Sequence, residues 1–258
     1  MTPSTPSSAP TPRSVLVTGG SRGIGAATAL LSAQRGWAVA VNYTSDAAAA
    51  QGIVARIREA GGTAIAVQAD VSDEAGVLAM FATIDRELPR LEALVNNAGV
   101  VDLPSRVDAT TMQRLQRMFA INVFGSFVCA REAVLRMSTK HGGNGGTIVN
   151  LSSAAARIGS PGQYVDYAAA KGAIDVFTMG LAKEVALEGI RVNAVRPGII
   201  ETDIHASGGT PDRAKQMAPL VPMQRAGSAD EVAQAIVWLM SGESSYTTGS
   251  VIDVTGGR

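Results

Sequence analysis

Tyr167 and Lys171, four residues apart, are the pair in this sequence best suited to proton chemistry. If the stretch Tyr-Ala-Ala-Ala-Lys is helical, the two side chains project from one face, about 40° apart around the axis. An ammonium group beside a phenol favours the phenolate, so Lys171 is expected to lower the pKa of Tyr167 from its ordinary value of about 10. Such a phenol suits proton exchange between an alcohol and a ketone. A Tyr-x-x-x-Lys pair on a helix is usually a surface feature without function. Whether this pair is functional depends on the elements around it.

A glycine-rich turn, residues 18–25 (TGGSRGIG), follows a short apolar strand predicted at 14–17. A helix is predicted directly after it, over residues 26–35. In a strand–turn–helix of this kind, glycines let the backbone approach a pyrophosphate, and the helix N-terminus directs N–H groups at it. The spacing Gly-x-x-x-Gly-x-Gly differs from the usual Gly-x-Gly-x-x-Gly, so a turn that merely needs glycines is the alternative interpretation.

The second predicted strand, residues 37–43, bears on which dinucleotide would bind. A site for the ribose 2′-hydroxyl of NAD needs Asp or Glu at the end of this strand. The sequence has Asn42 and Thr44 there, with no carboxylate before Asp46. Arg22 in the glycine turn can offer paired donors to a 2′-phosphate. The pattern therefore favours NADP over NAD, unless Arg22 is simply solvated.

Strands and helices alternate along the rest of the chain. Further strands are predicted at 63–68, 91–95, 147–151, 190–195 and 250–254, and helices at 46–60, from about 73 onward with Ser72 as N-cap, and at 111–137, 163–188 and 229–241. This alternation predicts an α/β fold: a Rossmann-type, doubly wound, seven-stranded parallel sheet with helices on both faces. We expect a disordered tail over residues 1–13, which are rich in Pro, Ser and Thr, and a single domain over 14–258.

Several residues near the predicted strand ends and in loops are candidates for ligand contacts. Asp70 is expected either to accept a hydrogen bond from an adenine amine or only to cap a loop. Asn122 lies inside a predicted helix, where asparagine is unfavourable, so a specific structural or catalytic hydrogen bond is expected. The segment 201–225 has weak periodicity and is interpreted as a lid over a substrate.

Composition excludes several classes of function. Lys plus Arg and Asp plus Glu both number 22, and this zero net charge argues against binding of nucleic acid or of an anionic membrane surface. The single Cys129 cannot form an intrachain disulfide, which suits a cytoplasmic location. No apolar run approaches the length of a membrane span, which needs about 20 residues. His141 and His205 lack partners at metal-ligand spacing, so no metal site is expected.

From Ser14 to the C-terminus, the sequence resembles the short-chain dehydrogenase/reductase family of the compact type. It is similar to the 3-oxoacyl-[acyl-carrier-protein] reductases and the bacterial glucose 1-dehydrogenases. The matching motifs, in the order and spacing of that family, are Thr18-Gly19-x-x-x-Gly23-x-Gly25, Asn96-Asn97-Ala98-Gly99, Asn122, Ser153, Tyr167-x-x-x-Lys171 and Pro197-Gly198.

The resemblance implies a catalytic tetrad of Asn122, Ser153, Tyr167 and Lys171. Tyr167 would be the general acid in reduction and the base in oxidation, and Lys171 would lower its pKa and bind the nicotinamide ribose. Ser153 would hold the substrate oxygen, and Asn122 would position a water that links Lys171 to solvent. Ser152 is the rival of Ser153, but it fits the family's interval to the tyrosine less well. Tyr164 is the rival of Tyr167, but no lysine follows it four residues later.

The resemblance also implies the residues that bind NADP(H). They would line the phosphates (Gly19, Ser21, Arg22, Ile24), the 2′-phosphate (Thr44), the adenine (Asp70, Val71), the ribose (Asn97, Ala98, Gly99) and the nicotinamide (Pro197, Ile200, Thr202).

The expected function is NADP(H)-dependent interconversion of a carbonyl and a secondary alcohol in a small molecule. The substrate is expected to be either a 3-oxoacyl thioester or a sugar or polyol. Arg157 is either a contact for a polar or anionic group of the substrate or a surface residue. The alternative is a non-catalytic NADP(H)-binding redox sensor on the same fold. The family usually assembles as homotetramers, and the small residues Ala168, Ala169, Ala170 and Gly172 would let helices of two subunits pack closely.

Overall fold

The computed structural model of this chain describes residues 12–202, 209–210 and 212–258. Its seven strands form one sheet in the order β3-β2-β1-β4-β5-β6-β7. All neighbouring strands are parallel, as predicted. The strands are β1 (Ser14–Val17), β2 (Ala38–Tyr43), β3 (Ala64–Gln68), β4 (Leu91–Asn96), β5 (Gly146–Leu151), β6 (Ile190–Pro197) and β7 (Val251–Val254).

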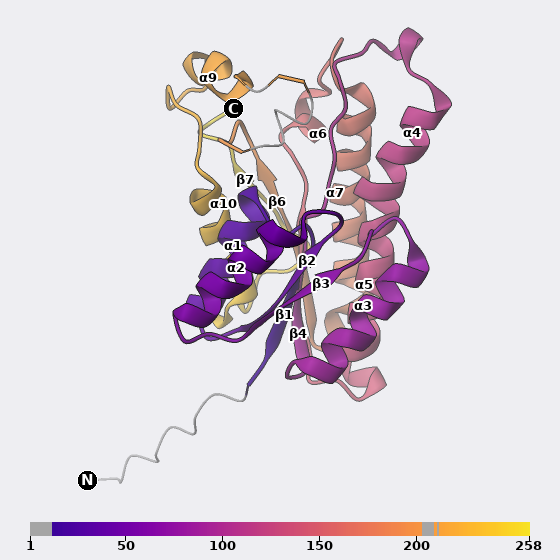
Figure 1. Ribbon diagram of the computed structural model, residues 1–258. Coiled ribbons are helices and arrows are strands. Elements are labelled where there is room, and N and C mark those ends of the chain that lie inside the picture. Colours follow the sequence, from indigo (N-terminus) through magenta and orange to yellow (C-terminus); the bar gives the residue numbers. More distant parts are fainter. Residues whose placement is uncertain (1–11, 203–208, 211) are drawn as a thin grey trace, which may run out of the picture.

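Helices cover both faces of the sheet, as Figure 1 shows. One face is covered by α1 (Gly23–Gln34), α2 (Ala47–Glu59) and α10 (Ala229–Met240). The other is covered by α3 (Glu74–Glu87), α5 (Gly125–Met137) and α7 (Val165–Val185). The doubly wound α/β prediction is therefore confirmed. Three shorter helices, α4 (Met112–Phe119), α6 (Ala155–Ile158) and α9 (Arg213–Met217), lie outside these layers.

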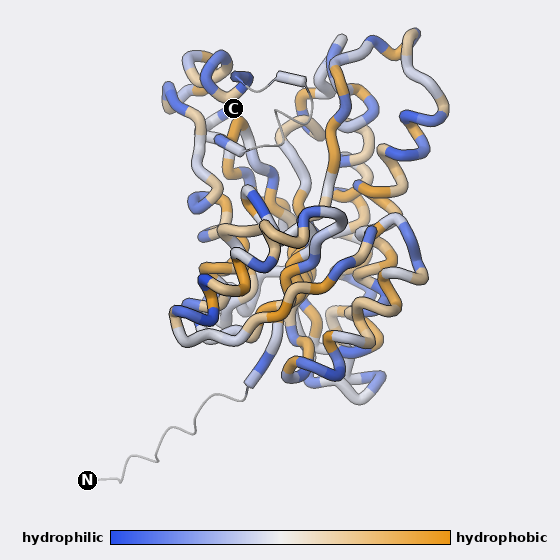
Figure 2. The backbone as a smooth tube through the Cα atoms, in the orientation of Figure 1, coloured by the Kyte–Doolittle hydropathy of each residue, from blue (hydrophilic) through white to orange (hydrophobic). Residues whose placement is uncertain are grey.

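The strands are apolar on both faces because each face is buried under helices. In β1, Leu16 packs in the cluster with α3 and α5, whereas Val15 and Val17 pack in the cluster with α1, α2 and α10. All three side chains are fully buried. Figure 2 shows the same arrangement as a hydrophobic centre with hydrophilic residues on the outer sides of the helices.

The strand order reverses between β1 and β4. In an open parallel sheet, such a reversal leaves a crevice beyond the carboxyl ends of the two strands, because their connections run to opposite faces. The glycine turn follows β1 and the segment Asn96–Gly99 follows β4, so both predicted ligand-binding segments meet at this crevice.

The predicted helix 111–137 is interrupted. It consists of α4, a π-helical turn at Ala120–Phe124 and α5, and Asn122 lies in the π turn. By length and composition, Met112–Met137 would be able to cross a membrane, contrary to our expectation, but half of its apolar window is buried inside the protein. Since it packs against α3, α7 and β4, we interpret it as a core helix.

Two further details of the chain differ from prediction. Asp73, not Ser72, is the N-cap of α3, because its carboxylate accepts hydrogen bonds from the backbone N–H groups of Ala75 and Gly76. The predicted lid contains α9 and a 3₁₀ turn at Ala218–Leu220, while its residues 203–208 and 211 lie outside the described part of the chain, as do residues 1–11 of the predicted tail.

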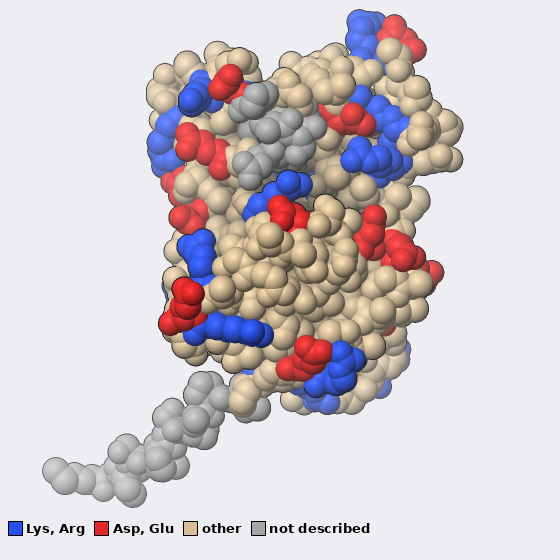
Figure 3. Space-filling view, in the orientation of Figure 1, with Lys and Arg blue, Asp and Glu red and all other residues tan. Residues whose placement is uncertain are grey.

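Positive and negative side chains are interspersed over the face seen in Figure 3. This agrees with the zero net charge of the sequence. Several of these charges form ion pairs between exposed side chains, such as Arg86–Glu87 and Arg225–Glu231.

Candidate active site

A cavity lies at the carboxyl end of the sheet. Tyr167 and Lys171 both line it, one helical turn apart on α7, as the sequence predicted. Its other lining residues come from four further regions: the glycine turn (Ile24), the segment after β4 (Asn97, Gly99, Val101), the segment from β5 to α7 (Leu151, Ser152, Ser153, Ala154, Ala155, Ile158, Ser160, Tyr164) and the segments that end the chain (Pro197, Gly198, Ile199, Ile200, Thr202, Thr210, Arg213, Arg258).

The structure distinguishes the two serines that follow β5. Ser152 is buried, and its hydroxyl donates a hydrogen bond of 3.2 Å to the backbone carbonyl of Lys171, so it anchors α7 to the sheet. Ser153 is partly exposed in the cavity and is hydrogen-bonded to the phenol of Tyr167. Its Oγ also accepts a hydrogen bond from Ala155 N at 3.1 Å, which fixes the side chain. Ser153 is therefore the serine that lies beside Tyr167 in the cavity.

Lys171 is almost completely buried, with 4% of its surface exposed. Its Nζ donates a 2.7 Å hydrogen bond to the backbone carbonyl of Leu151 and lies 5.6 Å from the centroid of the Tyr167 ring. Burial lowers the pKa of Lys171 from 10.5 to about 8, although the charge of Asp175, one turn further along α7, opposes this shift. The ammonium therefore changes charge close to physiological pH.

The expectation that Lys171 lowers the pKa of Tyr167 is wrong. Burial raises the pKa of Tyr167 above its ordinary value of 10.0, and the hydrogen bond with Ser153 offsets this only in part. The reason is geometric, since the ammonium is directed to the carbonyl of Leu151 and not to the phenol oxygen. With this raised pKa, Tyr167 is a protonated phenol near neutral pH.

Asn122 makes the specific hydrogen bonds that its position predicted. Its Oδ1 accepts from Val100 N at 3.2 Å, and its Nδ2 donates to the carbonyls of Val100 and Met118, both at 3.0 Å. The π turn projects this side chain toward the segment after β4. A Cβ on Gly99 would come within 2.7 Å of Asn122 Oδ1 and 3.5 Å of Lys171 Nζ, so the two side chains converge over this glycine.

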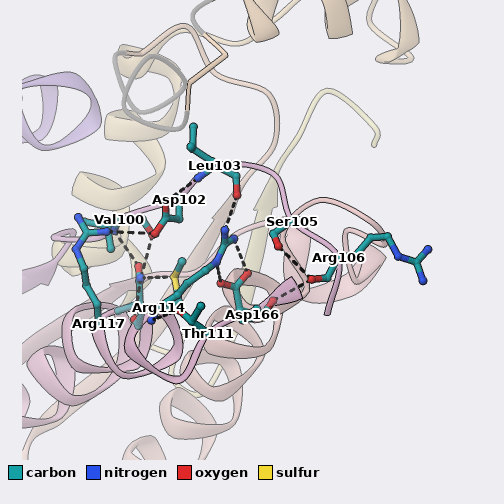
Figure 4. A network of polar contacts seen from close by, with 12 residues as sticks. Val100, Asp102, Leu103, Ser105, Arg106, Thr111, Arg114, Arg117 and Asp166 are labelled. Atoms are coloured by element: carbon teal, nitrogen blue, oxygen red, sulfur yellow. Dashed lines mark hydrogen bonds and ion pairs between the residues drawn. The ribbon is translucent and has the colours of Figure 1, made fainter. Parts of the chain in front are cut away.

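An ion pair holds the start of α7, where Tyr167 lies. Arg114 of α4 donates two hydrogen bonds to the carboxylate of Asp166, at 2.7 and 3.3 Å, and a third of 2.6 Å to the carbonyl of Leu103 (Figure 4). Both charged side chains are largely buried. Sequence reasoning missed this pair because its members are 52 residues apart and belong to no motif.

The glycine turn is fixed against the segment after β4. Thr18 Oγ1 accepts hydrogen bonds of 3.0 Å from the backbone N–H groups of Asn97 and Ala98, and Asn97 Nδ2 donates to the carbonyls of Thr18 and Gly19. Gly19 has a φ of +60°, which favours glycine. A Cβ on Gly25 would lie 2.2 Å from Gly19 O, so this position also requires glycine.

The N-terminus of α1 is available to an anionic group. Its N-cap residue is Arg22, and no side chain in the described part of the chain caps it. The guanidinium of Arg22 belongs to an exposed residue, and Ser21 and Ile24 of the same turn are partly exposed. Uncapped N–H groups and a positive dipole end are the features that favour a bound phosphate, the ligand that the glycine pattern predicted.

Two residues at the end of β2, Asn42 and Thr44, have different surroundings. Asn42 is buried, and its Oδ1 accepts from Gly19 N at 3.1 Å while its Nδ2 donates to the carbonyls of Val67 and Ala69. Asn42 thus shapes the glycine turn. Thr44, two residues later, is exposed beyond the end of the strand.

In the loop after β3, Asp70 makes the loop-capping contacts that were one of the two alternatives for it. Its Oδ1 accepts hydrogen bonds from the N–H and the hydroxyl of Ser72, at 2.9 and 2.7 Å, so it caps this loop. The side chain of Val71 is buried in the core, close to Gly125 of α5. Any contact of Val71 with a ligand is therefore made through its backbone.

The segment after β6 brings three predicted residues to the cavity. Pro197 and Ile200 are buried and Thr202 is partly exposed, and all three line the wall. A Cβ on Gly23 would lie 3.4 Å from Thr202, so this segment closes over the glycine turn.

The arginines that line the cavity are not the one considered in the sequence. Arg157 lies outside the lining and forms an ion pair with Asp253, which supports the surface alternative. Arg213 and Arg258 line the cavity instead. Sequence reasoning missed both, because one lies in a segment without periodicity and the other follows the last strand.

Among the described residues, no group of three or more His, Cys, Asp or Glu side chains could hold a metal ion. His205 lies outside these residues.

Comparison with known proteins agrees with this arrangement. A family model described as enoyl-(acyl carrier protein) reductase matches residues 19–258. The chain is 58% identical over 243 residues to the uncharacterized oxidoreductase YgfF of Escherichia coli, covering 94% of this chain and 98% of that protein. It is 39% identical over 243 residues to a 3-oxoacyl-[acyl-carrier-protein] reductase of Synechocystis, covering 94% and 95% of the two chains.

A solved structure extends the match to the fold. A mutant of a Serratia marcescens short-chain dehydrogenase/reductase aligns with a TM-score of 0.87 at 31% identity, covering 96% of this chain and 97% of that one. The motifs, the sheet and these matches lead to the same conclusion. The chain belongs to the short-chain dehydrogenase/reductase family and is an oxidoreductase of that family.

Proposed function

We propose that this protein is an NADP(H)-dependent oxidoreductase that interconverts a carbonyl and a secondary alcohol, with Tyr167 as the general acid and base. The observation that supports this most is the placement of Ser153, Tyr167 and Lys171 on one cavity wall, next to the glycine turn. Asn122 lies behind them, over Gly99. These groups can donate, accept and transfer protons at one substrate oxygen.

The residues at the crevice fit a nicotinamide dinucleotide. The turn places glycines where a Cβ would collide with backbone, and α1 presents an uncapped N-terminus. The contacts of the dinucleotide would be those that the family resemblance implies: Gly19, Ser21, Arg22 and Ile24 at the phosphates, Asp70 and Val71 at the adenine, Asn97, Ala98 and Gly99 at the ribose, and Pro197, Ile200 and Thr202 at the nicotinamide. When bound, the cofactor supplies or accepts the hydride, and the protein supplies orientation and electrostatics.

In the reducing direction, Tyr167 donates its proton to the substrate oxygen as that oxygen gains negative charge. Its raised pKa keeps the proton in place until then. The hydroxyl of Ser153 holds the same oxygen and stabilises the developing charge. Lys171 binds the ribose, and Asn122 positions a water that connects Lys171 to solvent. In oxidation Tyr167 accepts the proton.

A preference for NADP over NAD is supported by the charges around β2. Arg22 and Thr44 are both exposed at this edge of the crevice, and neither Asn42 nor Thr44 would repel a 2′-phosphate. Asn42 is occupied in shaping the turn. A guanidinium can bind the 2′-phosphate through paired donors.

The direct test is the substrate-dependent change in NADPH absorbance, measured with acetoacetyl thioester, glucose and simple diketones, using NADP and NAD in parallel. Tyr167→Phe should lower kcat by about 10²- to 10⁴-fold, since a general acid typically contributes that much. Tyr164→Phe is the matched control, because Tyr164 also lines the cavity but has no lysine one turn later. Equal turnover by wild type and Tyr167→Phe would contradict the proposal.

The same measurements address the other function considered. A redox sensor would bind NADPH and turn over none of the carbonyl compounds. Among enzyme substrates, 3-oxoacyl thioesters and sugars or polyols are separated by the relative rates in this panel.

We also propose a cytoplasmic homotetramer. Ala168 and Ala170 are buried within the subunit, so the predicted surface of small residues is only partly available. Exposed apolar side chains of the π turn, α5 and α7 support an interface formed by these helices instead: Phe124, Phe127, Val176 and Met179.

A further inference from the structure

Two arginines, Arg213 and Arg258, line the same cavity as Tyr167 and Ser153. Arg213 begins α9, and Arg258 follows β7, so two separate segments each bring a guanidinium to this wall. Lys171 adds a third cation. The described lining residues include no Asp or Glu.

The guanidinium of Arg258 has an unsatisfied hydrogen-bond donor. Its Nη1 is buried and has no hydrogen-bond partner among the described residues. A buried donor without a partner costs free energy, and the cost is larger when the group is charged. Among the described residues, Arg213 contacts two neutral side chains: Gln163 Oε1 accepts from its Nη2 at 2.8 Å, and its guanidinium lies 5.2 Å from the ring centroid of Tyr164.

Two other largely buried arginines of the described chain are matched with carboxylates. Arg114 pairs with Asp166 at 2.7 Å, and Arg196 pairs with Asp175 at 2.8 Å. Near the cavity, no Asp or Glu among the described lining residues is available to pair with Arg213 or Arg258. Burial lowers the pKa of Arg258, and the charge of Arg213 adds to this effect, so the two cations are close enough to repel each other. Both remain charged, because arginine does not lose its proton in proteins.

An anion between these two groups would satisfy both. Carboxylates and phosphates accept paired hydrogen bonds from guanidinium, and such charge-assisted bonds are about twice as strong as neutral ones. The lining of the same cavity also includes apolar side chains, among them Ile158 and Ile199. The cavity thus combines two guanidinium groups, apolar side chains and a proton donor.

We propose that the substrate carries an anionic oxygen group, a carboxylate or a phosphate, which Arg213 and Arg258 bind while Tyr167 and Ser153 contact the reacting oxygen. The substrate class is therefore an oxo acid or phosphorylated carbonyl compound and the corresponding alcohol. This inference rests on the proposed function, whose substrate it specifies.

The test compares anionic and neutral forms of one carbonyl compound. The carboxylate arm uses 4-oxopentanoate, 5-oxohexanoate and 6-oxoheptanoate, each against its methyl ester, and the phosphate arm uses dihydroxyacetone phosphate against dihydroxyacetone. With NADPH, the wild type should prefer one anion over its neutral partner by about 10- to 100-fold in kcat/KM, as expected for hydrogen bonds to a charged group. The arm that shows the preference identifies the group.

Variants assign the preference to the two arginines. Arg258→Met and Arg213→Met should each reduce it at least several-fold, mainly through KM, and should leave kcat/KM for the neutral partner nearly unchanged. Arg258→Lys keeps the charge without the paired donors and should retain part of the preference. Arg157→Met is the matched control and should change nothing, because Arg157 pairs with Asp253 outside the cavity.

The outcomes separate this inference from the proposed function. Turnover of neutral compounds with no anion preference, or a preference unchanged in both methionine variants, would overturn the inference and leave the proposed function intact. If no compound is turned over, calorimetric binding of the same pairs in the presence of NADP decides. Tighter binding of an anion that is lost in Arg258→Met supports the inference, and equal binding of both forms rejects it.

Discussion

Lys171 combines a charge with almost complete burial, and the two have opposing effects on its protonation. Burial lowers the pKa of this side chain to about 8, well below its value in an unfolded chain. Below pH 8 the folded protein therefore carries a buried ammonium at a cost in stability. Functional groups are often placed at such cost, because a perturbed pKa is useful in catalysis.

The pH dependence of stability tests the state of Lys171. Between pH 8 and about 10 the unfolded chain keeps the Lys171 proton and the folded protein loses it, so the contribution of this residue to the unfolding free energy rises with pH. The free energy of unfolding of wild type minus that of Lys171→Met should rise by about 2 kcal/mol over this window. Urea unfolding at pH 8, 9 and 10 measures it.

Lys183→Met on the same helix is the control for this prediction, since Lys183 is exposed. Its difference from wild type should stay constant with pH. A constant difference for Lys171→Met as well would mean that Lys171 has an ordinary pKa in the folded protein.

Gly99 shows how a backbone position can decide the placement of two reactive side chains. Gly99→Ala puts a Cβ within 2.7 Å of Asn122 Oδ1, so Asn122 must move and its hydrogen bonds to Val100 must stretch. We expect kcat to fall at least 10-fold and the unfolding free energy to fall by about 1–3 kcal/mol, the cost of unsatisfied buried groups.

The matched control is Gly52→Ala in α2, where a Cβ meets nothing within 4 Å. Alanine is the better helix former, so this variant should be more stable by about 0.5–1 kcal/mol and fully active. Activity assays and denaturant unfolding measure both. A fully active Gly99→Ala would contradict the proposed convergence of Asn122 and Lys171.

At the scale of elements, the start of α7 depends on α4. The Arg114–Asp166 pair fixes the residue directly before Tyr167, and a second, longer ion pair of 3.6 Å joins Arg117 to Asp102 in the same network. Burial by itself raises the pKa of Asp166, but hydrogen bonds from Arg114 and the backbone outweigh it, and the pKa lies below its ordinary value. The carboxylate is therefore ionised and paired at neutral pH.

Removing one partner of this pair should be costly. Asp166→Asn leaves the guanidinium of Arg114 largely buried without its counter-charge, so the unfolding free energy should fall by about 3 kcal/mol. Asp108→Asn is the matched control: its partner Arg106 is exposed, and the expected change is below about 0.5 kcal/mol. Denaturant unfolding at pH 7 compares them, and equal losses would show that the buried pair has no special role.

At the scale of the whole molecule, the outer side of α5 and α7 exposes a group of large apolar side chains. Phe127 stacks on Phe177 at 3.8 Å between ring centroids, and Val176 is 65% exposed. Contiguous apolar patches of this kind mark interaction surfaces. A second copy of the chain is the partner that we propose.

Light scattering should therefore give a mass about four times the 26.5 kDa of one chain. Val176→Arg should shift the protein to smaller species, because an unpaired charge in an interface is unfavourable. Leu187→Arg is the control, since this fully exposed residue lies in the turn after α7. A wild-type monomer would refute the tetramer, and an unchanged mass of Val176→Arg would refute this interface.

Local patterns in the sequence were sufficient for the sheet, the alternation of strands and helices, the glycine turn and the Tyr167–Lys171 pair. These features depend on residues close together in the chain, where periodicity and turn chemistry are decisive. The structure alone showed the π turn at Asn122, the ion pair beneath α7, the raised pKa of Tyr167 and the placement of Arg213 and Arg258. Each of these depends on contacts between distant segments or on burial, and neither quantity exists until the chain has folded.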